Sequence, residues 1–354
     1  MELRQALAKI QNIQALRGVA VLFVVLFHLV SIEQKYGGSE TILLESFQFG
    51  MYGVDLFFVI SGFVMVAVTR GRFQNKIYAL KFIYRRASRI YPTYWFYTIL
   101  VLIVFFIRPS WVNSSQGNQV DICASFLLLP SQNLPLLMVG WTLIHEMYFY
   151  LIFFLILLLV SERNMPATII SWGISVLFLN VGLKSSSLVM GIVSHPLTIE
   201  FIGGCLIALI YYKRNSQAAV CSLIMIAGSV LIASMFGYVY YRTLTRQIEP
   251  IHWWRVLIFG VPAMLMVYCF VNAEKRGFVL HSSLIKVGDA SYSIYLSHLL
   301  TLSAAGRVWS VFSTNAVYDN AIMIPVLFCL VMFVGIISYH LVEKPLLELS
   351  RKIA

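Results

Sequence analysis

The sequence predicts an all-α, polytopic membrane protein with about ten transmembrane helices. Of its 354 residues, 60% are hydrophobic and only 12% are charged, and the mean hydropathy is +0.82. A soluble domain is typically about 45–50% apolar and about 25% charged, so this excess of apolar residues cannot be buried in one globular core. Ten spans of about 20 apolar residues each would use about 200 residues. The composition therefore excludes a soluble enzyme, a disordered chain and a disulfide scaffold.

The hydropathy pattern, interrupted at Gly, Pro and charged residues, gives the spans in order. They cover residues 13–31, 50–69, 91–107, 137–160, 167–182, 196–212, 219–237, 255–271, 288–305 and 321–341. A further apolar run at 120–130 is too short to cross a bilayer and is interpreted as a re-entrant or interfacial segment. An even number of spans places both termini on the same side of the membrane.

Charge decides which side that is. With the N-terminus inside, the inner segments carry 18 Lys and Arg and the outer segments carry 7. The positive-inside rule therefore predicts that both termini are cytoplasmic, although Arg242 and Arg246 in the loop 238–254 run against it. The same rule explains the net charge of +11, so we expect membrane lipids and no nucleic acid as partners. Without a repeat, linker or soluble appendage, residues 1–354 are expected to form a single transmembrane domain.

The first span contains two ionisable residues, Arg17 and His28. A charged group at the bilayer centre costs at least about 2.5–3.5 kcal/mol on insertion scales, so each such residue is a functional candidate. At about 100° and about 1.5 Å per residue, these two lie on nearly one helical face and about 16 Å apart. The alternative interpretation is a snorkelling Arg17 and a His28 bonded to neighbouring backbone.

Asp55 lies about five residues inside the second span, at a depth similar to that of His28. A carboxylate there could hold the imidazole tautomer and stabilise the imidazolium, as the orienting group of a base dyad does. Gly50, Gly53 and Gly62 would allow close helix packing. The alternative is a structural Asp55 that caps the start of its helix.

Seven basic residues and no acidic one occur between Arg70 and Arg89. Arg86 and Arg89 are three residues apart on the helix that enters the third span near Pro92, so they share a face. Two such guanidinium groups can bind phosphates through forked hydrogen bonds, and Arg85 lies beside them. The alternative is that these basic residues only set the membrane topology and bind anionic lipids.

The fourth span carries His145 and Glu146 about ten residues from its start, with Trp141 and Thr142 one turn above. A glutamate at that depth requires a partner or a water-filled cavity, which makes Glu146 a functional candidate. His145 points about 100° away from it and is more typical of packing.

The ninth span is polar on one side and contains His298, with Arg307 at its outer end. From these residues alone, two classes of function are open. One is group transfer from a phosphorylated cytoplasmic donor. The other is a proton-coupled transporter or flippase that uses Asp55, Glu146 and His28 as its relay. No metal-ligand spacing occurs, so we expect no metal.

Several segments, in this order, resemble motifs of the acyltransferase-3 family of membrane O-acyltransferases. They are Arg17-x10-His28, GVDLFFVISGF at 53–63, RRASRIYPTYW at 85–95, GWTLIHEMYFY at 140–150, DASYSIYLSHL at 289–299 and HLVEKP at 340–345. Within the family the chain is most similar to the stand-alone acetyltransferases that modify bacterial exopolysaccharide or O-antigen, without the appended SGNH-type domain of some members. The resemblance implies a multi-pass protein of the bacterial inner membrane.

The resemblance also implies cytoplasmic acetyl-CoA as donor and a sugar hydroxyl on a polysaccharide or lipid-linked glycan as acceptor. It makes His28 the catalytic base, Arg17 its polar partner and Glu146 the acid of the fourth span. Arg86 and Arg89, with Arg85, would bind the CoA phosphates. The orienting role of Asp55, and acceptor contacts by Trp141, His298 and Arg307, are our own expectations.

A neutral histidine suits this reaction, because it can accept the hydroxyl proton as the oxygen attacks the already activated thioester. An acyl-histidine intermediate that the acceptor then attacks is an equally compatible route.

Overall fold

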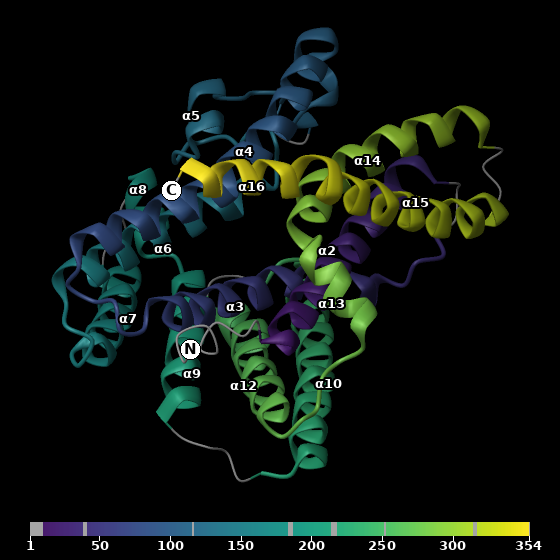
Figure 1. The fold of residues 1–354 in the computed structure, drawn as a ribbon. Coiled ribbons are helices and arrows are strands. Elements are labelled where there is room, and N and C mark those ends of the chain that lie inside the picture. The colour runs from purple at the N-terminus through teal and green to yellow at the C-terminus, as the bar shows by residue number, and fades with distance from the viewer. Residues whose placement is uncertain are drawn as a thin grey trace.

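Every element of the described chain is helical (Figure 1). The computed structural model describes residues 10–37, 41–114, 117–182, 187–213, 218–250, 253–313 and 317–353. The long helices are α2 (Gln11–Tyr36), α3 (Tyr52–Thr69), α4 (Lys76–Ile107), α6 (Gly140–Leu159), α7 (Met165–Gly182), α9 (Leu197–Lys213), α10 (Val220–Thr245), α12 (Val261–Lys275), α14 (Ser291–Phe312) and α15 (Val317–Ser338). Shorter elements join them: η1 (Glu45–Met51), η2 (Pro109–Trp111), α5 (Ile122–Leu127), α8 (Leu188–Val193), α11 (Trp253–Arg255), η4 (Val256–Gly260), α13 (Ser282–Asp289), η5 (Tyr339–Glu343) and α16 (Lys344–Ile353).

The predicted all-α membrane architecture is confirmed. Eight helical segments of the described chain are long and apolar enough to cross a membrane, judged by length and composition. The other two predicted spans correspond to α7, whose apolar stretch is shorter, and α14, whose Ser and His residues lower its hydropathy. The count of ten therefore stays a prediction. Exposed phenylalanines such as Phe106, Phe236 and Phe333 cover the outer faces of α4, α10 and α15, as lipid contact requires.

The helix of the third predicted span begins well before that span. The span was expected at 91–107, and α4 begins at Lys76 and contains Pro92 in its interior. The side chain of Asn75 accepts a hydrogen bond from the Tyr78 amide (3.0 Å) and so caps the helix start. This extension places the basic run of 76–89 on a continuous helix that leads into the bundle.

Glycines bring the central helices into backbone contact. A Cβ added to Gly62 of α3 would lie 1.9 Å from the Phe201 carbonyl oxygen of α9, and one on Gly204 would lie 1.9 Å from that of Val59. In the same way α2 packs on α13 through Gly288, where a Cβ would lie 1.8 Å from the Gln14 oxygen. Small residues at such positions allow the close approach on which helix packing in membranes depends.

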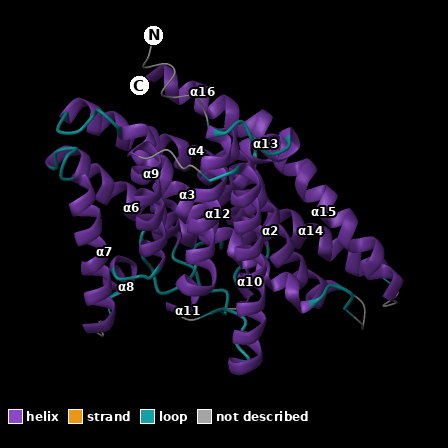
Figure 2. Ribbon diagram, turned by 90° about the horizontal axis from the view of Figure 1, so that it is seen from below, coloured by secondary structure: helices purple, strands orange, loops and turns teal. Residues whose placement is uncertain are grey.

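The first described turn of the chain and its last helix lie at the same end of the bundle. The amides of Gln11 and Asn12 at the start of α2 donate to Glu274 near the end of α12 (2.8 and 2.7 Å). Figure 2 shows α13 and α16 at that end and α8 and α11 at the other. This arrangement agrees with an even number of crossings, while the cytoplasmic assignment of that end stays a prediction.

Candidate functional site

A basic cavity opens at the end of the bundle where α4, α13 and α16 meet. We call it the basic vestibule. Its volume is about 740 Å³, and its charged lining consists of Arg17, Arg85, Arg86, Arg89 and Arg351 with Asp289 and Glu343. Ligand sites typically have volumes of about 300–1,000 Å³. The structure thus brings the three arginines of the predicted phosphate site together with Arg17 of the first helix, and it adds Arg351.

A second, narrower space lies deeper in the bundle, and we call it the inner cavity. Its volume is about 100 Å³ and it contains Glu146, with walls from α3, α6 and α14. Arg17, Arg86 and Arg89 line both cavities, so these guanidinium groups form the boundary between them. The spacing argument that placed Arg86 and Arg89 on one helix face is confirmed.

Within the described residues, the hydrogen bonds to Glu146 all reach one carboxylate oxygen, Oε1. Tyr150, one turn along α6, donates its hydroxyl hydrogen to Glu146 Oε1, and Ser61 of α3 donates at 3.4 Å. Arg86 lies over the Tyr150 ring (5.8 Å from guanidinium carbon to centroid), and its buried Nε has no hydrogen-bond partner among the described residues. A buried donor without a partner is rare in folded proteins, and here it borders a cavity. The arrangement leaves hydrogen-bonding capacity available to a ligand.

His28 and His298 lie against each other between α2 and α14, with ring centroids 5.0 Å apart. The Nδ1 atom of His298 lies 2.6 Å from the backbone oxygen of Tyr295. Because a carbonyl oxygen can only accept, Nδ1 must carry the hydrogen, and Nε2 then presents a lone pair. That Nε2 is buried and has no hydrogen-bond partner among the described residues. The fold therefore fixes His298 in a tautomer that can accept a proton.

Tyr295 connects the histidines to the inner cavity. Its side chain lines that cavity, and its ring centroid lies 5.7 Å from that of His298. Its hydroxyl is 2.8 Å from Thr142 Oγ1 on α6. Tyr295 therefore forms the wall between the inner cavity and the histidine pair.

The structure pairs Asp55 with Arg255, and the expected orienting role of Asp55 toward His28 stays a prediction. Asp55 is fully buried and both of its oxygens accept hydrogen bonds from Arg255, from Nε at 2.8 Å and from Nη2 at 2.9 Å. Glu200 of α9, also fully buried, interacts electrostatically with the pair. Both carboxylate oxygens of Asp55 are thus engaged by the Arg255 guanidinium. The sequence missed Arg255 because it lies 200 residues away from Asp55.

The predicted acceptor residues do not share one site. Trp141 packs edge-on against His145 (6.0 Å between centroids), and His145 lies 4.6 Å from the ring of His195. Arg307 instead stacks on aromatic rings near the far ends of α2 and α14. Neither Trp141 nor Arg307 lines the basic vestibule or the inner cavity.

Glu343 is a vestibule residue that was not singled out from the sequence. It is 4% exposed, and its Oε2 accepts hydrogen bonds from the backbone amide (3.1 Å) and the hydroxyl (2.6 Å) of Ser293. It ends the π-helical turn η5, and such turns occur frequently at functional sites. A carboxylate at the end of an apolar span, within HLVEKP, was the available signal.

Among the described residues there is no group of three or more His, Cys, Asp or Glu side chains that could hold a metal ion.

Comparison with known proteins identifies the family of this chain. Residues 10–340 match the acyltransferase domain of the acyltransferase-3 family. The chain is 29% identical over 323 residues to the exopolysaccharide production protein ExoZ of Rhizobium meliloti, covering 86% of this chain and 92% of that protein.

Two further relatives are more distant. The O-acetyltransferase OatA of Staphylococcus aureus is 25% identical over 327 residues, which is 81% of this chain but only 49% of OatA. The acyltransferase MdmB of Streptomyces mycarofaciens is 24% identical over 331 residues, covering 85% of this chain and 81% of MdmB. No solved structure matches the chain. The chain therefore belongs to the acyltransferase-3 family, and it is a multi-pass membrane O-acyltransferase.

Proposed function

We propose that the protein transfers an acetyl group from cytoplasmic acetyl-CoA to a hydroxyl group of a cell-surface or exported polysaccharide. The observation that carries this proposal is the pair of cavities that share Arg17, Arg86 and Arg89 and lead toward a histidine pair. The names of the relatives, an exopolysaccharide production protein and an O-acetyltransferase, support the acceptor class and the acyl group. We place the protein in the bacterial inner membrane, with the basic vestibule facing the cytoplasm.

The basic vestibule suits the nucleotide end of the donor. CoA is polyanionic, and guanidinium groups bind phosphates through paired, charge-assisted hydrogen bonds. Five arginines against two carboxylates leave an excess of positive charge on the lining. The inner cavity beyond them has a volume of about 100 Å³, and we assign it to the thin pantetheine arm of the donor. Glu146, Ser61 and Tyr150 line it for hydrogen bonding.

The histidine pair suits the acceptor end. In the proposed step, Nε2 of His298 or the ring of His28 takes the proton of the attacking hydroxyl. The hydroxyl oxygen forms an ester bond with the acetyl carbon, the thioester C–S bond breaks, and the proton finally protonates the departing thiolate. In the covalent route the attacking atom is an imidazole nitrogen, and the acceptor hydroxyl displaces it in a second step. In both routes the Tyr295 side chain must move so that the acetyl end of the donor can reach the histidine pair.

The competing hypothesis, a proton-coupled transporter or flippase, uses Asp55, Glu146 and His28 as a relay. The bidentate hydrogen bonds between Arg255 and Asp55 support a structural role for Asp55 rather than a place in such a relay. Membership of an acyltransferase family also favours covalent transfer.

The test uses purified protein in nanodiscs, acetyl-CoA labelled in its acetyl group, and cell-envelope glycan as acceptor. Wild-type protein should release CoA thiol and label the glycan, whereas His28→Ala should lose activity by about 100- to 10,000-fold, the usual contribution of a general base. His298→Asn keeps a hydrogen-bond donor near the position of Nδ1 but loses Nε2, so it should fold normally and lose activity to a similar degree.

The matched control is His340→Ala, because His340 is an exposed histidine of the same chain. It should retain wild-type activity. Label on the protein in the absence of glycan would support the covalent route. If well-folded wild-type protein released no CoA under any condition but moved glycan across the bilayer, the transporter hypothesis would replace this proposal.

A further inference from the structure

Two cations and two aromatic rings gather at the end of α2 and α14 away from the basic vestibule. The guanidinium carbon of Arg307 lies 4.6 Å from the centroid of the Trp111 ring and 5.6 Å from that of Tyr36. The ammonium of Lys35 lies 5.5 Å from the same Tyr36 ring. We call Lys35, Tyr36, Trp111 and Arg307 the cationic aromatic cluster.

The packing of the two helices builds this cluster. A Cβ at position 306 would lie 2.6 Å from Cδ2 of Tyr36, so Gly306 is what lets that ring lie against the backbone of α14. Arg307 follows Gly306 directly and covers the ring, while its Nη1 donates to the Ser303 carbonyl oxygen (3.0 Å). Cation–π contacts hold the guanidinium in place, so less side-chain freedom would be lost when it binds a ligand.

Neither cation of the cluster pairs with a carboxylate among the described residues. The carboxylates of the neighbouring elements have other partners: Glu33 accepts hydrogen bonds from the amides of Ile42 (2.7 Å) and Leu43 (3.0 Å), and Asp319 accepts one from the Ser313 hydroxyl (3.0 Å).

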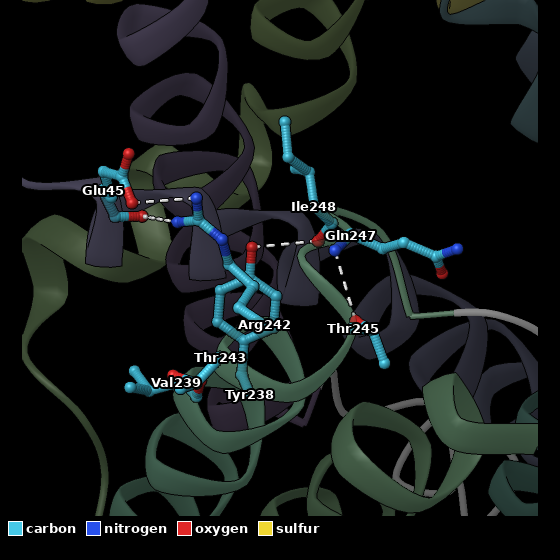
Figure 3. A network of polar contacts seen from close by, with 8 residues as sticks. All are labelled: Glu45, Tyr238, Val239, Arg242, Thr243, Thr245, Gln247 and Ile248. Atoms are coloured by element: carbon cyan, nitrogen blue, oxygen red, sulfur yellow. Dashed lines mark hydrogen bonds and ion pairs between the residues drawn. The ribbon is translucent and has the colours of Figure 1, made fainter.

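Arg242, near the end of α10, shows the opposite situation. Its Nη2 lies 2.8 Å from the carboxylate of Glu45, and its Nη1 donates to the Glu45 backbone oxygen (Figure 3). An arginine of this kind is already neutralised. Arg307 has no such carboxylate partner among the described residues, so it can neutralise a charge brought by a ligand.

The position of the cluster relates it to the acceptor rather than the donor. Tyr36 lies eight residues beyond His28, about 12 Å along α2, and Arg307 lies nine residues beyond His298, about 13–14 Å along α14. Arg17 and the donor cavities lie in the opposite direction from His28. The cluster is therefore where a part of the acceptor remote from the reacting hydroxyl would lie.

We propose that the acceptor is anionic and that the cationic aromatic cluster binds its negative charge. The charge is a phosphate that links the glycan to a lipid, or a carboxylate of an acidic sugar, since a guanidinium fork matches either group. Trp111, whose side chain is 51% exposed, offers its face to an adjoining sugar ring. This inference rests on the proposed function and specifies the charge class of its acceptor. Arg307 acts as a specificity residue and does not touch the reacting atoms.

The experiment measures binding and transfer separately. Geranylgeranyl diphosphate represents a lipid-linked phosphate, oligoglucuronate an acidic sugar, and a neutral oligoglucoside the uncharged case. Binding to protein in zwitterionic nanodiscs is followed by the fluorescence of Trp111, with Trp111→Phe as the reference for the remaining tryptophans. The variants are Arg307→Gln, Arg307→Lys and, as matched control, Arg242→Gln, each checked for folding by its melting temperature.

We expect one anionic probe to bind at least about tenfold more tightly than the neutral one, a difference of about 1.4 kcal/mol. Arg307→Gln should remove most of that preference, Arg307→Lys should retain part of it, and Arg242→Gln should keep it. The anion whose binding is lost identifies the source of the charge. Equal binding of all three probes, or an unchanged preference in Arg307→Gln, would overturn the inference.

Transfer is measured on cell-envelope glycan separated by anion exchange into neutral, uronate-containing and lipid-diphosphate-linked fractions. The anionic fractions should be labelled with the lower KM, and Arg307→Gln should raise that KM more than it lowers kcat. If wild-type protein labels no fraction yet binds the anionic probe through Arg307, the proposed function fails and the anion site stands. If it labels all fractions with the same KM, the proposed function stands and the anion site is wrong.

Discussion

The basic vestibule and the buried ion pair of Asp55 and Arg255 both place charges inside the bundle, but they differ in how the charges are satisfied. In the ion pair, Arg255 donates two hydrogen bonds to Asp55, while both carboxylate oxygens of the neighbouring Glu200 have no hydrogen-bond partner among the described residues. In the vestibule and inner cavity, arginines outnumber carboxylates, and the Nε of Arg86 is left without a partner among the described residues. Charges that satisfy each other hold the fold together, whereas charges that face a cavity without partners are available to an anionic ligand.

The difference has an energetic basis. Removing a charge from water costs several kcal/mol, which only a well-placed partner offsets. Asp55 and Arg255 offset that cost permanently. The vestibule arginines line a cavity, so their hydrogen-bonding groups remain available to a ligand.

The largest effect is expected from breaking the ion pair of Asp55 and Arg255. Arg255→Met leaves a fully buried Asp55 carboxylate without its partner and should destabilise the protein by about 3–5 kcal/mol. Thermal unfolding in detergent, followed by intrinsic fluorescence, measures this loss. Arg242→Met is the control, because its partner Glu45 is 75% exposed and such pairs contribute about 0–1 kcal/mol. Recovery of stability in the double variant Asp55→Leu, Arg255→Met would show that the unpaired charge caused the loss.

The second prediction concerns the open arginines. The double variant Arg86→Gln, Arg89→Gln should fold normally and raise the KM for acetyl-CoA by about tenfold to hundredfold, since hydrogen bonds to charged groups contribute about 1.5–3 kcal/mol. The KM at two salt concentrations is the measurement, and the variant should lose most of the salt dependence. Arg163→Gln removes an exposed arginine from a loop at the same end of the bundle and should leave KM unchanged. A lower melting temperature with an unchanged KM would assign Arg86 and Arg89 to the fold instead.

A third prediction concerns the packing of α3, which carries Asp55, against α9, which carries Glu200. Gly62→Ala introduces a Cβ 1.9 Å from the backbone oxygen of Phe201, so α3 and α9 must move apart. Overpacking of this kind costs about 1–3 kcal/mol. Gly228→Ala is the matched control, because a Cβ at Gly228 meets no atom within 4 Å and alanine favours a helix. Equal melting temperatures of the two variants would contradict the close contact of α3 and α9.

The smallest effect is expected at the rim of the vestibule. Ser293→Ala removes the 2.6 Å hydrogen bond to Glu343 and should cost about 1–2 kcal/mol of stability, with a small rise in the KM for acetyl-CoA. Ser303→Ala, on the same helix α14, is a control, because the Ser303 hydroxyl bonds to no cavity residue among the described residues. An unchanged melting temperature would mean that the backbone amide of Ser293 alone holds the carboxylate.

The fold class and most of the candidate site follow from local sequence, for a physical reason. An apolar run long enough to cross a bilayer must be helical, because its backbone groups can find partners only within the segment. Residues three or eleven positions apart on such a helix share a face, so the grouping of Arg86 with Arg89 could be predicted.

Partnerships between helices could not be predicted in this way. Asp55 and His28 lie at similar depths in successive spans, and depth alone suggested that they form a pair. Depth does not fix the rotation of a helix about its axis. Gly62 and Gly204 set the contact of α3 with α9, and α3 presents Asp55 to Arg255 instead. The partner of His28 proved to be His298, which comes from a span 270 residues later in the chain.

The sequence by itself determined a multi-pass helical protein, an acyltransferase-3 motif set and a pair of arginines on one helix face, because hydropathy and helical spacing are local properties. Only the tertiary structure decided which charges neutralise each other and which remain open to a ligand. It paired Asp55 with Arg255, fixed the tautomer of His298 through the Tyr295 carbonyl, and placed the Arg307 guanidinium over aromatic rings. Each of these depends on contacts between side chains of different helices, and such contacts exist only once the helices have packed.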